Sequence, residues 1–212
     1  MRDGSRAREL LPTIVLTLLS VVQALALEAL WSAVHENPLF FAGGADAWVV
    51  WLQALAIFQG IIVVWLFYIA IVMRFSWIPA TRDSIAPFVL GAGELSMIQT
   101  MDPDLLAWWF WILAAIFAFS TRISNSMFAA GLQDPSNTGV WMPQPGGALE
   151  RSASYLAAGG IALLGGLVWW QGGNGAVALV SVVFANLALF GQAMLIQHYW
   201  RLWVGAVDDG AS

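Results

Sequence analysis

The sequence predicts an all-helical, multi-pass membrane protein with six transmembrane helices, and three observations point to this fold class. Of its 212 residues, 60% are hydrophobic and only 10% are charged, whereas an ordinary soluble domain carries about 25% charged residues. The apolar residues form long runs that match the roughly 30 Å thickness of a bilayer's hydrocarbon layer. The arginines between these runs sort to one side of a six-span arrangement, as they do in membrane proteins.

The six predicted spans are residues 11–34, 47–73, 84–101, 105–122, 152–170 and 175–203. We expect the first to be a retained helix rather than a cleaved signal, because its apolar run is long enough to span. The third and fourth are separated by Asp102, Pro103 and Asp104, a triplet typical of a tight turn whose aspartate caps the next helix. Residues 123–151 are rich in Pro, Gly, Gln, Ser and Asn and predict an irregular cytoplasmic loop. We expect residues 1–212 to form a single transmembrane domain.

The distribution of arginine predicts the orientation of the chain. If both termini are cytoplasmic, all the arginines fall on the cytoplasmic side: Arg2, Arg6, Arg8, Arg74, Arg82, Arg122, Arg151 and Arg201. The outer loops then contain none, as the positive-inside rule requires. Most tryptophans fall near the two predicted membrane boundaries, where aromatic rings favour the headgroup region. We therefore expect a multi-pass protein of the bacterial inner or plasma membrane, surrounded by the lipid bilayer.

Composition excludes several functions. The chain has no cysteine and its basic residues are all arginine, which removes thiolate and lysine Schiff-base chemistry. A formal charge of −5, with no basic patch, argues against a nucleic-acid partner. His35 and His198 are expected about a bilayer thickness apart, so they cannot bind one metal or haem within a subunit. No phosphate-binding or metal-binding motif occurs, and we expect no cofactor, no metal site and no catalytic residue.

The stretch PFVLGAGELSMIQT, residues 87–100, places Glu94 near the middle of the third span. A charged carboxylate at a helix centre costs roughly 2.5–3.5 kcal/mol on insertion scales, so its presence needs a reason. Pro87, Gly91 and Gly93 weaken the same helix, and an interrupted span at bilayer depth is typical of transporter sites. We expect Glu94 to bind a cation or relay a proton beside a backbone break at the two glycines.

Further polar residues are candidates for the same pathway. Glu28, in the outer half of the first span, is expected on the outer access path, while Gln59, Gln99 and Asn186 lie at depths similar to Glu94. For the amides, hydrogen bonding between helices is the favoured alternative.

Small residues also recur on the fifth span. Ala158, Ala162 and Gly166 follow one another at intervals of four residues. This spacing predicts a face on which another helix packs closely.

Three hypotheses about function follow. The first is a channel or transporter for a cation, proton or small polar solute, acting through Glu94 and assembled as a homo-oligomer or with a partner in a membrane complex. The alternative is a non-catalytic membrane subunit, assembly factor or sensor whose intramembrane polar groups are structural. An intramembrane enzyme is the third hypothesis, and the absence of cysteine, lysine and clustered histidine leaves it mainly carboxylate chemistry.

Overall fold

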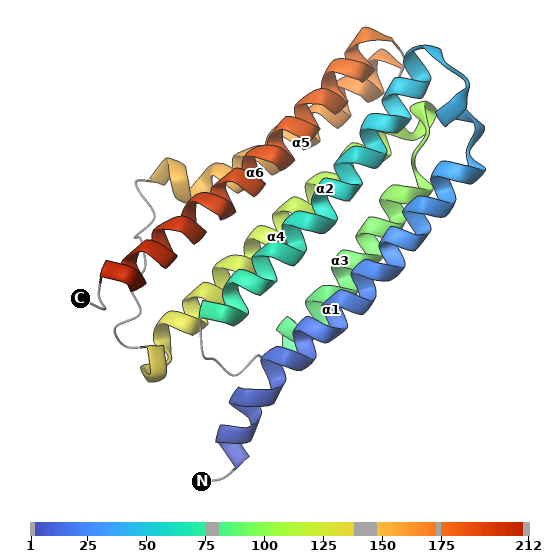
Figure 1. Ribbon diagram of the computed structural model, residues 1–212. Coiled ribbons are helices and arrows are strands. Elements are labelled where there is room, and N and C mark those ends of the chain that lie inside the picture. The colour runs from blue at the N-terminus through green and yellow to red at the C-terminus, as the bar shows by residue number, and fades with distance from the viewer. Residues whose placement is uncertain (1–2, 75–80, 138–147, 173–174, 210–212) are drawn as a thin grey trace.

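In a computed structural model of the chain, six long α-helices form a bundle (Figure 1). The structure describes residues 3–74, 81–137, 148–172 and 175–209, and these residues contain no β-strand. The helices are α1 (Asp3–Glu36), α2 (Gly44–Arg74), α3 (Thr81–Gln99), α4 (Leu106–Gln133), α5 (Ala148–Gln171) and α6 (Ala176–Asp209). The predicted all-helical class is confirmed.

The helices lie in two layers of three. One layer contains α1, α2 and α6 with α2 in the middle, and the other contains α3, α4 and α5 with α4 in the middle (Figure 1). Successive helices run in opposite directions, so α1 begins at the end of the bundle where α2, α4 and α6 finish. We call this the terminal end, and the opposite end, which carries the short connections, the far end.

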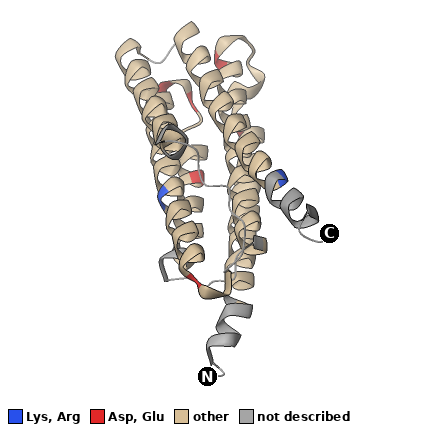
Figure 2. Cartoon of the chain, turned by 90° about the vertical axis from the view of Figure 1, so that its left-hand side faces the viewer, with Lys and Arg blue, Asp and Glu red and all other residues tan. Residues whose placement is uncertain are grey.

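Five of the described helices are long and apolar enough to cross a membrane, namely α1, α2, α4, α5 and α6. Acidic and basic residues are sparse along the described parts of these helices (Figure 2). These helices therefore indicate a multi-pass membrane protein. Helix α3 is shorter, with 19 residues, and it packs beside α1 in the bundle.

Helix α4 is longer than the sequence analysis predicted, because it continues past Arg122 to Gln133. The expected loop over residues 123–151 is therefore wrong in its first part. Ile123, Met127 and Gly131 recur every four residues and are all buried, so this segment has the apolar stripe that a packed helix needs. Ile123 and Met127 belong to a core cluster with residues of α1, α2 and α3.

The connections at the far end follow the predicted turn chemistry. Asp102 caps a short 3-10 helix, Pro103–Leu105, by accepting a hydrogen bond from the Asp104 backbone N–H at 2.8 Å, and α4 begins immediately afterwards. Asn37, between α1 and α2, donates from its side-chain amide to the Met101 carbonyl at 3.1 Å. This hydrogen bond therefore links the α1–α2 connection to the α3–α4 connection.

Candidate functional site: a cavity bordered by Glu94

Helix α3 is continuous from Thr81 to Gln99, with Pro87 inside it. The backbone break expected at Gly91 and Gly93 is therefore absent. The glycines serve close packing instead, since a Cβ at Gly91 would overlap Val22 of α1, and a Cβ at Gly93 would lie 2.8 Å from Ile116 of α4. The missing side chains let α3 fit between its neighbours, which is the usual reason for small residues in membrane helices.

Glu94 is held by a glutamine of the neighbouring helix. Its side chain is only 4% exposed, and the Gln23 amide nitrogen donates to both carboxylate oxygens, at 3.1 and 3.2 Å. Gln23 is itself 4% exposed. The two buried side chains therefore fix each other's orientation and join α1 to α3.

The depth of Glu94 follows from its neighbours. Ile116, against which Gly93 packs, lies about 15 Å along the axis of α4 from the first residue, Leu106, at 1.5 Å per residue. Half the thickness of the hydrocarbon layer is also about 15 Å. If α4 crosses the bilayer from its first residue, Glu94 lies near the midplane.

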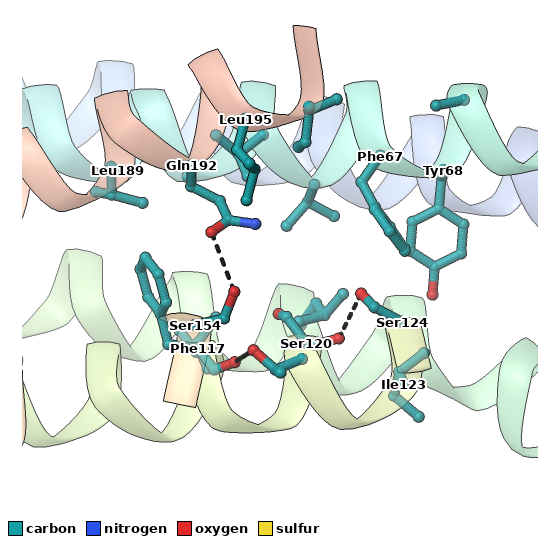
Figure 3. Close-up of a pocket in the computed structure, with 18 of the residues that line it drawn as sticks. Phe67, Tyr68, Phe117, Ser120, Ile123, Ser124, Ser154, Leu189, Gln192 and Leu195 are labelled. Atoms are coloured by element: carbon teal, nitrogen blue, oxygen red, sulfur yellow. Dashed lines mark hydrogen bonds between the residues drawn. The ribbon is translucent and has the colours of Figure 1, made fainter. Parts of the chain in front are cut away.

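Glu94 lines a partly open cavity between the two layers, with a volume of about 350 Å³. The walls come mainly from α2, α4 and α6, with contributions from α3 and α5. On α2 the lining extends from Ala56 to Ile71, and on α4 from Leu113 to Leu132. The cavity therefore runs from the level of Glu94 toward the terminal end. Figure 3 shows Phe67 of α2 and Leu195 of α6 on one side and Phe117, Ser120 and Ser124 of α4 on the other.

The polar part of the lining is concentrated on α4. Thr121 donates to the Phe117 carbonyl at 2.8 Å and Ser124 to the Ser120 carbonyl at 2.7 Å. Because these hydroxyl protons are used within the helix, the hydroxyl oxygens keep lone pairs that can accept a bond from a ligand.

A second polar contact crosses the cavity wall. Ser154 of α5 donates to the Gln192 side-chain oxygen of α6 at 3.3 Å (Figure 3). This bond joins two helices that otherwise meet little along their length.

Beyond the cavity, the far end of the bundle is closely packed. Val50, Leu106, Trp109 and Phe110 are fully buried there, and they belong to the larger core cluster. Gln53, also fully buried, donates to the Thr100 carbonyl at 3.4 Å. The cavity is therefore closed toward the far end by a packed layer of aromatic and aliphatic side chains.

The structure separates the other sequence candidates from the cavity. Glu28 and Gln99 are exposed on the outside of α1 and α3, and neither they nor Gln59, a half-buried residue of α2, line it. Asn186 of α6 is buried and donates to the Leu52 carbonyl of α2 at 3.0 Å. Asn186 therefore joins two helices by a hydrogen bond, which is the role that the alternative hypothesis gave to the amides. Of the seven candidate residues, only Glu94 borders the cavity.

The hydroxyl residues of α4 that line the cavity were not among the residues predicted from the sequence. Ser120, Thr121 and Ser124 are spaced so that they lie on one side of a helix, but this signal is visible only if the helix is known to continue past Arg122. Gln192 of α6, which also lines the cavity, was not among the predicted pathway residues either.

Comparisons with protein-family models, curated proteins and solved structures gave no match to this chain. Its function is therefore inferred from the chemistry of the cavity and of Glu94.

Proposed function

We propose that this chain is a six-span membrane carrier for a cation, a proton or a small polar solute, with Glu94 as the group that the solute or proton reaches. Helix α3 is then the sixth span, both termini are cytoplasmic, and the protein belongs to a bacterial inner or plasma membrane. The terminal end of the bundle is the cytoplasmic end.

The observation that carries this proposal is that a buried carboxyl at mid-bundle lines a cavity that runs toward one end only. An intramembrane acid of this kind is expensive and marks ion or proton pathways in membrane proteins. The arginines support the orientation, because the positive-inside rule assigns the arginine-rich side to the cytoplasm.

The packed far end favours a carrier over an open channel. A channel needs a continuous path, whereas here Trp109, Phe110 and their neighbours fill the space between Glu94 and the far end. In alternating access, one set of helices moves against another around a site near the midplane. The pairs α2–α6 and α4–α5 are each closely packed but are in sparse contact with each other, so these pairs are the natural moving parts, and we assign the present arrangement to the state open to the cytoplasm.

The test is flux into liposomes that contain the purified protein. We expect Glu94→Gln to abolish proton flux, or its dependence on pH, measured with an entrapped pH-sensitive dye under an imposed potassium gradient with valinomycin. The replacement removes the ionisable group and keeps an amide that can pair with Gln23. Glu28→Gln is the matched control, because Glu28 is exposed and lies off the cavity. Flux and pH dependence that persist unchanged in Glu94→Gln would overturn the proposal.

A non-catalytic membrane subunit or assembly factor is the second candidate. It is favoured by the close packing at Gly91 and Gly93 and by the Asn186 bond to α2, since such contacts hold helices together without any transport. On this hypothesis Glu94→Gln leaves every function of the complex intact, and the protein co-purifies with a stoichiometric partner.

A further inference from the structure

The lining of the cavity restricts the charge of a ligand. Glu94 is the only acidic or basic side chain among the described residues that line it. An anion would meet no opposite charge there, and burying an unpaired charge is costly. The lining therefore suits a cationic ligand or a neutral one.

The lining is also too apolar for a bare inorganic cation. Such ions are bound by six or more oxygen atoms, whereas most of the wall consists of aliphatic and aromatic side chains such as Val64, Phe67, Phe117 and Leu195. An apolar wall lowers the free energy of a ligand that itself carries apolar surface.

An aromatic ring near Glu94 strengthens the preference for positive charge. Phe117 of α4 lines the cavity next to Ile116, which packs against Gly93, so it lies near the level of Glu94. The face of an aromatic ring attracts a cation. The hydroxyl oxygens of Thr121 and Ser124, whose protons are donated to the backbone, add acceptors on the same wall.

We propose that the cavity binds an organic cation whose apolar body lies against the walls from α2, α4 and α6 and whose positive charge lies at Glu94. This inference rests on the proposed carrier function and narrows its solute to a lipophilic organic cation. The cavity volume of about 350 Å³ lies at the lower end of the roughly 300–1,000 Å³ found for sites of small organic ligands.

Binding of three probes of similar shape and different charge tests the proposal. Tetraphenylphosphonium, tetraphenylborate and tetraphenylsilane are cationic, anionic and neutral, and each is measured by equilibrium dialysis against protein in nanodiscs, with empty nanodiscs as the blank. We expect specific binding of the cation at least about tenfold tighter than that of the other two, because only the cation is attracted by the charge of the Glu94 carboxylate. Equal affinity for the cation and the neutral probe would overturn the proposal.

Two variants locate the site. Glu94→Gln should weaken binding of the cation by about tenfold or more, with Glu28→Gln unchanged. Gly60→Leu should block binding by filling the cavity, because Gly60 lines it and an added Cβ there meets no atom within 4 Å. Gly159→Leu is the matched control, a glycine of α5 with equally open surroundings that does not line the cavity. Tight binding in both Glu94→Gln and Gly60→Leu would reject this site.

The two proposals fail separately. If the cation does not bind but proton flux still depends on Glu94, the carrier function stands and the organic cation is rejected. If the cation binds at this site but no probe is transported, the binding site stands and the carrier function is rejected.

Discussion

Glu94 and the glycines that precede it form a short motif that fits either a helix interruption or close packing between helices. The pair Gly91 and Gly93 looks like a helix interruption in the sequence, because glycine and proline both weaken helices. In the structure each glycine instead faces a different neighbour, Val22 on one side and Ile116 on the other. The acid was predictable from its position in an apolar run, but its partner Gln23 was not, since the register of α1 against α3 is a tertiary property.

The close approach at Gly91 gives a prediction at the scale of single residues. Gly91→Ala should destabilise the protein by about 1–3 kcal/mol, because the new methyl group would overlap the Val22 side chain in a packed interface. Thermal unfolding in detergent measures the loss. Combining it with Val22→Ala should restore part of the stability, and Gly159→Ala should have little effect because its surroundings are open. A double variant no more stable than Gly91→Ala alone would contradict this interface.

At the scale of elements, the apolar runs predicted six helices in the right order. Their ends were harder to predict, as α4 shows. Its extension contains the polar run Ser124, Asn125 and Ser126, which is typical of a loop, yet Ile123 and Met127 on the other side of the helix are buried. Polar residues that face a cavity inside the bundle cannot be distinguished from loop residues by composition alone.

Helix α5 shows the same limitation in its packing face. The expected stripe of Ala158, Ala162 and Gly166 is only partly correct, since Ala158 is buried and Gly166 is exposed. The close contact falls one residue earlier, at Gly165, where an added Cβ would lie 2.8 Å from the Trp111 ring of α4. The spacing of small residues predicted a packing face on α5, but the position of the close contact, at Gly165, is set by the Trp111 ring of α4.

The extension of α4 gives a prediction at the scale of elements. Met127→Ala should lower the free energy of unfolding by about 2–5 kcal/mol, because a fully buried side chain is removed from a core. Met73→Ala is the matched control, since Met127 is 1% exposed and Met73 is 70% exposed. If both variants unfold at the temperature of the parent protein, residues 123–133 do not pack as the structure has them.

For the whole molecule, the decisive feature is the cavity between the two layers, which is lined mainly by α2, α4 and α6. Hydropathy predicts which segments enter the membrane, and the arginines predict their orientation, but neither predicts where packed layers part. The cavity depends on how α2, α4 and α6 are placed so that Gly60, Ser120 and Leu195 line one space. Its relation to Glu94 therefore required the structure.

The central claim is that water reaches this cavity from the cytoplasmic side, and the absence of cysteine in the chain makes a direct test possible. Ser120→Cys places a thiol on the cavity wall, and Ala115→Cys places one on the outer, exposed face of the same helix, about 7.5 Å nearer the far end. Only a thiolate reacts readily with a maleimide, so a thiol in lipid stays unreactive.

The measurement is labelling of each variant by a membrane-impermeant maleimide in right-side-out and inside-out membrane vesicles. We predict that Ser120→Cys is labelled when the cytoplasmic face is accessible and not from the opposite face, while Ala115→Cys is labelled from neither. A Ser120→Cys thiol that stays unlabelled from both sides would mean a dry cavity and would contradict the role proposed for Glu94.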